Sequence, residues 1–472
     1  MAVTECGAGD AVHLTLDDVL AATGGAMGSG MERSLAFGAV ATDSRRALSG
    51  ALFVALRGPH HDGHDFVGQA LAAGAAAAMV DRAVPGACAA RLVHVGDTLQ
   101  ALGDLAAWGR RQCPTPVVAV TGSNGKTTTK ELIAAVCAAA GWDVLKTEGN
   151  LNNLIGLPLT VLGARGDEAI RVLEMGMNRP GEIARLTEIA RPDVAVVTNV
   201  GPAHLEGVGG TMAGVAAAKG ELFAGLPAGA CIAVNGDDAW VRRIAMPFAG
   251  RKVVFGTAGE VRALNVRDLG GDGLAFTLAI ARETAELHLR LVGAHNVTNA
   301  LAAAAVGHAL GLRVDTIAHG LARAEGPAMR MRARRLANGV TVIDDAYNAN
   351  PSSMEAALQA LTRLPGRAVA VLGEMRELGD EGRRAHHVLG ERAATLGVAQ
   401  VVVLGRYAEA VAAGAVAAGM PRAAVQICTS HADAARAVLA QWQPGDAVLV
   451  KGSRAMRMEA VVRLLEDAGD AS

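Results

Sequence analysis

The segment from Val117 to Lys130 constrains the fold of this 472-residue chain more than any other. It reads Val-Val-Ala-Val-Thr-Gly-Ser-Asn-Gly-Lys-Thr-Thr-Thr-Lys. The apolar run at 117–120 predicts a short buried strand, residues 121–125 form a turn with two glycines, and Lys126 begins a helix. A strand, a glycine-bearing turn and a helix in this order hold phosphate, because backbone N–H groups and the positive end of the helix point toward an anion.

The spacing of the glycines differs from that of the common phosphate-binding loop. Two residues separate Gly122 from Gly125, whereas the common motif places four before its Gly-Lys pair. An ordinary strand-to-helix turn is the alternative, but the order of the elements favours phosphate binding. We expect Lys126 to reach the terminal phosphates and the Thr127 hydroxyl to bind Mg²⁺. The residues expected to contact the nucleotide here are Thr121, Gly122, Ser123, Asn124, Gly125, Lys126, Thr127 and Thr128.

Composition argues against several other classes of protein. With a net charge of −2 and no basic block, the chain is not expected to bind nucleic acid. No run of about 18 uncharged apolar residues occurs, and the N-terminus lacks the pattern of a secretory signal, so a cytoplasmic protein without stable membrane insertion is predicted. The six cysteines are scattered, which favours free thiols in a reducing compartment over a disulfide or zinc framework.

The length and the alternation of strands and helices predict three α/β domains. The prolines at 114 and 116 mark the first boundary, so the expected domains are 1–112, 113–326 and 327–472. In the small first domain, strands are expected at 51–56 and 91–95 and helices at 66–78 and 97–111. The central domain is expected to hold a parallel sheet around the phosphate loop, with a small antiparallel sheet appended at 261–292. The last domain is predicted to be a doubly wound, Rossmann-like sheet.

Polar residues follow two strands of the central block. Glu174 comes directly after one apolar run, and His204 lies in the loop after the next. The carboxyl ends of parallel strands share one edge of a sheet, so these side chains are plausible metal ligands beside a nucleotide. Lys219, among small residues of a predicted helix, reads by itself as an ordinary surface lysine.

Other polar residues stand at comparable positions. Asn296 and Asn299 share one face at the start of a helix, where Asn296 could cap the helix and either could contact an adenine edge. In the last block, Asp344 to Asn350 follows a strand, and either Arg330 or Arg332 could reach across to a transferring phosphoryl group. The loop at 61–66 suggests a rigid turn at a small-molecule pocket more than a metal site.

Taken together, these motifs resemble the Mur ligases, which form amide bonds with ATP in bacterial cell-wall precursor synthesis. The resemblance covers nearly the whole chain and includes the phosphate loop, Glu174, Lys219 and the segments 199–204 and 295–299. Three further segments resemble the member that adds D-alanyl-D-alanine to UDP-N-acetylmuramoyl-tripeptide: 149–158, 345–354 and 372–379. The Asp-Asn-Pro-Arg motif of the preceding ligase is absent.

The resemblance implies an ADP-forming ligase that works through an acyl phosphate and supplies peptidoglycan synthesis, and with it cell shape and division. It implies ATP and two Mg²⁺ ions, one on Thr127 and Glu174 and the other on His204 and a carbamylated Lys219. The residues it identifies as catalytic are Lys126, Glu174, His204, Lys219 and Arg330.

The resemblance also assigns binding residues. Asn296 and Asn299 match adenine contacts, and Asp345 matches the ribose contact. The residues implied for the UDP-linked substrate and its acceptor are Asp43, Ser44, Arg45, Asn152, Asn153, Tyr347 and Asn348.

Several alternatives stay open at this point. Another Mur-type or folylpolyglutamate-type ligase is the nearest, and a regulatory ATPase or nucleotide-binding scaffold is a more distant one. A monomer is expected. The sequence leaves open the third residue of the tripeptide, the oligomeric state, the degree of domain closure and the choice between Arg330 and Arg332.

Overall fold

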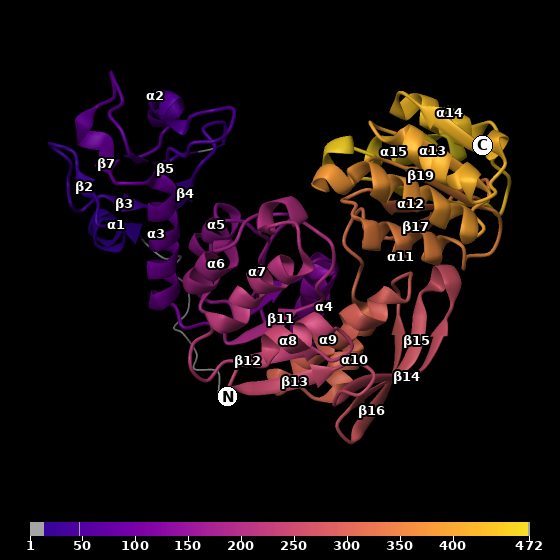
Figure 1. Cartoon of the computed structure of the whole chain (residues 1–472). Helices are drawn as coiled ribbons and strands as arrows, with labels where there is room; N and C mark the ends of the chain where they lie inside the picture. Colours follow the sequence, from indigo (N-terminus) through magenta and orange to yellow (C-terminus); the bar gives the residue numbers. More distant parts are fainter. Residues whose placement is uncertain (1–13, 47, 471–472) are drawn as a thin grey trace.

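Three large sheets organise the part of the chain that the structure describes (Figure 1). The structure is a computed structural model and describes residues 14–46 and 48–470. The N-terminal stretch that lacks a secretory pattern, with Cys6, lies outside the described residues. Within those ranges, no helix is long and apolar enough to cross a membrane. The described cysteines are free thiols.

The N-terminal sheet has the strand order β2-β7-β6-β5-β4 and is parallel except for β2. Helices α1 and α3 pack against one face of this sheet, and α2 packs against the other. The strands are β2 (Ala26–Met27), β4 (Ala39–Ala41), β5 (Ala51–Val54), β6 (Ala77–Val80) and β7 (Leu92–His94); β1 (Leu14–Thr15) pairs with β3 (Ala36–Phe37) beside it. The helices are α1 (Leu16–Thr23), α2 (Val67–Ala72) and α3 (Thr98–Gln112).

The predicted helix at 66–78 is wrong in its second half. Helix α2 ends at Ala72, and Gly74 takes a left-handed backbone with φ of 101° that turns the chain. The alanines that follow enter β6, a strand buried between β5 and β7. Small side chains fit there because both faces of this strand are covered by helices, so the alanine run marks a buried strand instead of a helix.

The central sheet has the order β16-β15-β14-β13-β12-β11-β8-β10-β9. Its strands are β8 (Val117–Thr121), β9 (Val144–Lys146), β10 (Ile170–Glu174), β11 (Val194–Val197), β12 (Cys231–Asn235), β13 (Arg251–Phe255), β14 (Val261–Asp268), β15 (Leu274–Ile280) and β16 (Glu283–Leu289). The predicted antiparallel strands are confirmed, and they extend the main sheet. Phe255 of β13 pairs in parallel with Val261 of β14, and β14 to β16 then run antiparallel.

Helices cover both faces of the central sheet. One face carries α4 (Lys126–Ala139), α9 (His295–Ala309) and α10 (Val314–Arg323). The other carries α5 (Gly156–Leu162), α6 (Glu182–Ala190), α7 (Met212–Ala224) and α8 (Ala239–Ala245). Helix α3 joins this second layer through Ala106 and Ala107 while Leu102 packs in the N-terminal core, so one helix links the two cores.

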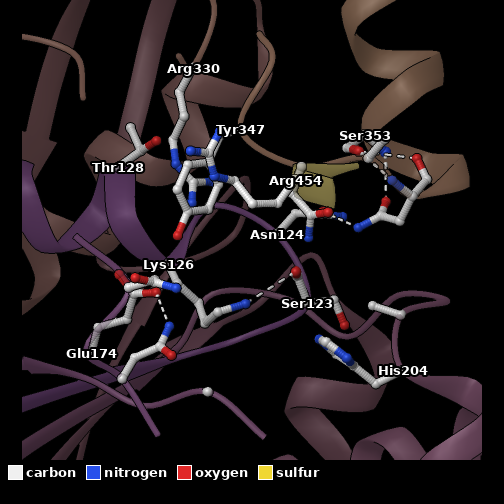
Figure 2. Close-up of a pocket in the computed structure, with 18 of the residues that line it drawn as sticks. Ser123, Asn124, Lys126, Thr128, Glu174, His204, Arg330, Tyr347, Ser353 and Arg454 are labelled. Carbon is white, nitrogen blue, oxygen red and sulfur yellow. Dashed lines mark hydrogen bonds between the residues drawn. The ribbon is translucent and has the colours of Figure 1, made fainter. Parts of the chain in front are cut away.

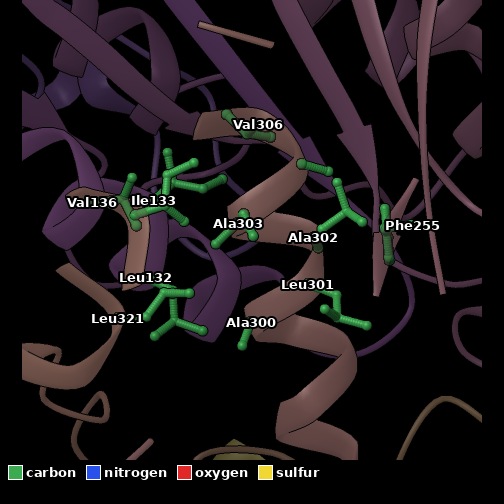
Figure 3. Packing of buried hydrophobic residues seen from close by; sticks show 14 of the residues in the cluster. Leu132, Ile133, Val136, Phe255, Ala300, Leu301, Ala302, Ala303, Val306 and Leu321 are labelled. Carbon is green, nitrogen blue, oxygen red and sulfur yellow. The ribbon is translucent and has the colours of Figure 1, made fainter. Parts of the chain in front are cut away.

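Small residues let the helices of the first layer approach closely (Figure 3). Ala300, Ala302 and Ala303 of α9 are fully buried between α4 and the sheet. A Cβ at Gly320 of α10 would lie 2.6 Å from Cα of Val136 on α4. Such a core has few aromatic side chains, so each one it does contain fills a large volume.

The C-terminal sheet has the order β17-β18-β22-β19-β20-β21 and is parallel except for β17. Its strands are β17 (Arg332–Arg335), β18 (Thr341–Asp345), β19 (Ala368–Leu372), β20 (Gln400–Leu404), β21 (Val425–Cys428) and β22 (Ala447–Lys451). Helices α11 (Pro351–Leu361), α12 (Gly382–Thr395) and α13 (Ala408–Ala417) cover one face, and α14 (His431–Leu439) and α15 (Glu459–Asp470) cover the other. The predicted doubly wound architecture is confirmed.

Phe255 offers a test of this alanine-rich core. Its side chain is fully buried beside Leu301 and Ala302. We expect Phe255→Ala to lower the free energy of unfolding by about 3–5 kcal/mol, because small neighbours cannot fill the cavity. Urea unfolding followed by tryptophan fluorescence, to which Trp142 beside the same core contributes, measures the change. Met246→Ala is the control, since Met246 is 74% exposed and its loss should cost less than about 0.5 kcal/mol.

Candidate active site

Strand β8, which ends in the predicted phosphate loop, lies between β10 and β11. The three strands are parallel, so their carboxyl ends meet at one edge of the sheet. Glu174 is the last residue of β10, and His204 lies in the loop after β11. The two residues therefore share the edge of the sheet that holds the loop, as the sequence predicted, and the strand order places them on opposite sides of the loop.

Both glycines of the loop are required by close contacts. Gly122 has φ of 150°, and a Cβ there would lie 1.9 Å from Oγ1 of Thr198. Gly125 has φ of 78°, and a Cβ there would lie 2.2 Å from Oδ1 of Asn299. A side chain at either position would displace the loop from the end of β11 or from α9.

Residues after β11 also hold the backbone of the loop. The backbone N–H of Asn124 donates to Oδ1 of Asn199 (2.9 Å), and Nδ2 of Asn199 donates to the carbonyl of Asn124 (3.1 Å). The Thr198 hydroxyl donates to the same carbonyl at 2.6 Å. Sequence analysis included Asn199 in the segment 199–204 but assigned it no role, although it stands at a strand end like Glu174.

Lys126 begins α4 and lines the cavity above the loop. Its Nζ donates to the carbonyl of Gly122 at 2.8 Å and to that of Ser123 at 3.4 Å, which bends the side chain back over the loop. Figure 2 shows the contact with Ser123. Burial lowers the pKa of Lys126, while the Glu174 carboxylate opposes that shift. Among the described residues no side chain caps this helix, so its first N–H groups are available to an anion.

Two buried oxygens beside Lys126 have no hydrogen-bond partner among the described residues. They are Oγ1 of Thr127 and Oε2 of Glu174. The other carboxylate oxygen of Glu174 accepts a hydrogen bond from Nδ2 of Asn152 at 2.7 Å. A hydroxyl and a carboxylate are the hard oxygen ligands that Mg²⁺ takes beside phosphates, so this pair fits such an ion. Within the described ranges, no group of three or more His, Cys, Asp or Glu side chains forms a complete protein cage for a metal.

Lys219 is not the surface lysine that its sequence context alone suggested. It lies on α7 and is 1% exposed. None of the described carboxylates lies within ion-pair distance of its ammonium group. Burial lowers the pKa of Lys219 well below its usual range, and the nearby Lys126 ammonium lowers it further.

A cavity of about 1090 Å³ opens above the loop and is walled by residues of the central and C-terminal sheets. Most of the predicted site residues line it: Ser123, Asn124, Gly125, Lys126, Thr128, Asn152, Asn153, Glu174, His204, Asn296, Asn299, Arg330, Asp345, Tyr347 and Asn348. The structure therefore brings together residues that are far apart in the sequence.

The remaining predicted residues are not part of this wall: Asp43, Ser44, Arg45, Thr121, Gly122, Thr127 and Lys219. Thr121 donates a hydrogen bond to the carbonyl of Met175 and is fully buried. Asp43 and Arg45 lie at the carboxyl end of β4 in the N-terminal part, where Nη2 of Arg45 is 2.8 Å from Oδ2 of Asp43. The Arg45 guanidinium lowers the pKa of Asp43 through this contact.

The structure distinguishes the two candidate arginines. Arg330 lines the cavity and lies over the ring of Tyr347, with Cζ 4.1 Å from the ring centroid (Figure 2). Arg332 is exposed on β17. The residues on either side of Arg330, Met329 and Met331, have φ of 59° and 51°. This left-handed backbone is costly for methionine and directs Arg330 toward Tyr347.

Several predicted binding residues already have partners within the chain. Asn299 donates to Oδ1 of Asn296 at 2.8 Å, and Asn296 donates to the carbonyl of Val292. Asn153 accepts from backbone N–H groups at the start of α5. Oδ2 of Asp345 lies 2.7 Å from Nζ of Lys451. Lys451, a cavity residue that sequence analysis missed, ends β22 and was detectable by the same strand-end argument that selected Glu174.

Asn124 also joins the phosphate loop to the C-terminal part. Its Oδ1 accepts from Nδ2 of Asn350 (2.7 Å), and its Nδ2 donates to Oγ of Ser352 (2.8 Å). Asn350 caps α11 through the backbone N–H of Ser353. Sequence analysis placed these residues near the ligand edge but could not identify their partner, which lies more than two hundred residues earlier.

Comparison with known proteins gives a consistent result. Residues 37–109 match the family described as "Mur ligase family, catalytic domain". Residues 120–307 match "Mur ligase middle domain", and residues 329–454 match "Mur ligase, glutamate ligase domain". UDP-N-acetylmuramoyl-tripeptide–D-alanyl-D-alanine ligase of Escherichia coli (strain K12) is 40% identical over 435 residues, which cover 91% of this chain and 94% of that protein.

Solved structures match this chain in fold and over nearly its whole length. A crystal structure of MurF from Acinetobacter baumannii has a TM-score of 0.89 and 34% identity, covering 96% of this chain and 99% of its own. MurF ligase from Thermotoga maritima in complex with ADP has a TM-score of 0.83 and 32% identity, covering 92% of this chain and 98% of its own.

Asn124 provides a test of how the C-terminal part is held. Asn124→Ala removes two hydrogen bonds to the start of α11, each worth about 0.5–1.5 kcal/mol. We expect faster amide hydrogen exchange at residues 351–354 and a larger radius of gyration in small-angle scattering. Gln359→Ala is the control, because Gln359 is exposed on the same helix. Unchanged exchange and scattering would show that these bonds do not hold the two parts together.

Proposed function

The chain belongs to the Mur ligase family, and we propose on that premise that it joins D-alanyl-D-alanine to UDP-N-acetylmuramoyl-tripeptide with the consumption of ATP. It is an ADP-forming ligase of peptidoglycan precursor synthesis. The 40% identity to the E. coli ligase over 91% of this chain supports this substrate pair. One observation supports the chemistry most directly. The phosphate loop lies beside two unpartnered oxygens of the kind that Mg²⁺ binds, and it faces a cavity of about 1090 Å³.

In the first step the terminal carboxylate of the tripeptide attacks the γ-phosphorus of ATP. An acyl phosphate forms, and ADP leaves with the electrons of the broken P–O bond. Two anions meet in this step, so positive groups must offset their repulsion. Lys126 and Arg330 line the same cavity and supply that charge from the central and the C-terminal part.

In the second step the amine of D-alanyl-D-alanine attacks the acyl carbon. The tetrahedral intermediate collapses to the amide, phosphate leaves, and the amine nitrogen loses a proton. Water would hydrolyse the acyl phosphate, so the site must exclude it. Residues from both the central and C-terminal parts line the cavity, which supports this role.

We assign two Mg²⁺ sites to the chain. Thr127 and Glu174 would hold one, and their buried unpartnered oxygens support this. His204 and a carbamylated Lys219 would hold the other. When bound, Mg²⁺ neutralises phosphate charge and acts as a Lewis acid on the transferring group.

Carbamylation of Lys219 is chemically reasonable at this position. A neutral amine attacks CO₂, forms a carbamate and releases a proton. The Lys219 side chain is buried and has no carboxylate partner among the described residues, which disfavours its ammonium form. The carbamate would replace a cation with an anionic oxygen ligand.

The binding roles follow the wall of the cavity. We assign Asn296 and Asn299 to the adenine and Asp345 to the ribose, and Ser123, Asn124, Gly125 and Thr128 to the phosphates, with Thr121 and Gly122 shaping their loop. The residues assigned to the substrate and acceptor are Asn152, Asn153, Tyr347 and Asn348. Asp43, Ser44 and Arg45, which lie apart from the cavity, would hold the UDP end of a long substrate.

We further propose domain boundaries at 112/113 and 326/327, which fall between the three matched family segments. We also propose that the chain acts as a monomer in the cytoplasm. Helix α3 connects the first two domains, so they should move as one body while the third domain moves separately.

Phosphate release tests the proposed function directly. We expect release from ATP when UDP-N-acetylmuramoyl-tripeptide and D-alanyl-D-alanine are both present, and a loss of most of it when either is omitted. Release without any amino-acid requirement would identify a regulatory ATPase. Release with a single amino acid in place of the dipeptide would identify a different amide ligase.

Lys219 variants test the proposed modification. We expect Lys219→Ala to lose most activity, and short carboxylates to restore part of it by supplying the missing anion. Lys219→Arg should be inactive and resist this rescue, because its permanent cation repels the metal. Mass spectrometry of the intact chain at high bicarbonate measures the added CO₂. Full activity of Lys219→Arg would show that activity needs no carbamate and that Lys219 has only a structural role.

A further inference from the structure

A carboxylate from the C-terminal sheet reaches the candidate metal ligand His204. Glu377 lies in the loop after β19, and its Oε2 is 2.8 Å from Nδ1 of His204. Both residues line the main cavity. Among the described residues, Glu377 is the only carboxylate within ion-pair distance of His204, and the buried Nδ1 makes no hydrogen bond of ordinary angle to any of them. The contact therefore joins the C-terminal part to the central part at the imidazole of His204.

The backbone on both sides of this contact is fixed in an uncommon conformation. His204 has φ of 57° and Glu377 has φ of 64°, both in the left-handed region. Such a backbone persists in these residue types only where the surroundings hold it. The side chains are thus directed toward each other by their local folds.

The loop that carries Glu377 is anchored at neighbouring residues. The backbone N–H of Arg376 donates to Oγ of Ser453 at 2.9 Å, and that of Met375 donates to Nε2 of the buried His386 at 2.9 Å. Nδ1 of His386 lies 2.6 Å from the carbonyl of Gly382 at the start of α12. Glu377 therefore moves with the C-terminal part as a rigid body.

A histidine that binds a metal usually donates its other ring N–H to a carboxylate, which sets its tautomer and orientation. We propose that Glu377 is the positioning residue for His204: it holds the proton on Nδ1 and leaves Nε2 free to bind a divalent cation. This inference rests on the proposed role of His204. It adds that the carboxylate comes from the C-terminal part.

Docking of the C-terminal part then completes the second cation site. The same docking places Asn350 and Ser352 on Asn124 of the phosphate loop. A cation that binds more tightly to the docked form must favour docking by the same free energy. Cation binding and docking are therefore coupled, and the site for the second cation is weak until the C-terminal part docks.

Mn²⁺ binding tests this role without turnover. Electron paramagnetic resonance of free Mn²⁺ is followed during titration of the full chain with a non-hydrolysable ATP analogue. We expect Glu377→Ala to weaken the weaker Mn²⁺ site about 10–100-fold and to leave the tighter site unchanged. Glu377→Gln should have a smaller effect, because its amide oxygen still accepts the Nδ1 proton.

Glu381→Ala is the matched control. Glu381 lies four residues further along the same segment, and its carboxylate is 3.4 Å from Arg384 rather than near His204. Its Mn²⁺ affinities should equal those of the unmodified chain. A loss in Glu381→Ala as large as in Glu377→Ala would mean a general disturbance of the loop and would overturn the proposal.

His204→Ala separates failure of this inference from failure of the proposed metal site. If His204→Ala weakens the second site and Glu377→Ala does not, the positioning role is wrong and the metal site stands. If neither variant changes Mn²⁺ binding, the assignment of His204 is wrong as well. If the role is correct, the double variant binds Mn²⁺ no more weakly than His204→Ala alone, because Glu377 acts only through that imidazole.

Discussion

The close fit between the phosphate loop and the end of β11 is the constraint on which the rest of the site depends. Thr198 and Asn199 bind the backbone of Asn124, and the Thr198 hydroxyl leaves no room for a Cβ at Gly122. The loop is therefore held in shape by neutral hydrogen bonds before any anion binds. A preorganised set of donors does not have to reorient during phosphoryl transfer, which is the main source of electrostatic catalysis.

Asn124 extends this constraint to the C-terminal part. The backbone of Asn124 is bound by the central sheet, while its side chain is bound by the start of α11. The contact between Glu377 and His204 is a second polar link between the C-terminal part and the central part. Two polar contacts thus place cavity-lining groups of the C-terminal sheet against the nucleotide loop and a candidate metal ligand.

Burial changes the chemistry of groups that look ordinary in the sequence. Lys219 sits among alanines and glycine on a helix, a context that usually means a solvated surface. In the fold this helix packs between α6 and α8 against the sheet, so the lysine is enclosed. The alanine run at 75–78 was misread for a related reason, because alanine suits both a helix and a strand that is covered on two sides.

The sequence by itself determined most of the local elements, the alternation that gives three α/β units, and the residues at strand ends, including Glu174, His204 and Asp345. These follow from hydrophobic periodicity and turn residues within short windows. Only the tertiary structure decided that β8 lies between β10 and β11, that Lys219 is buried and that Glu377 meets His204. Strand order and domain docking depend on side chains packed together from distant segments, and no local pattern of residues encodes those pairs.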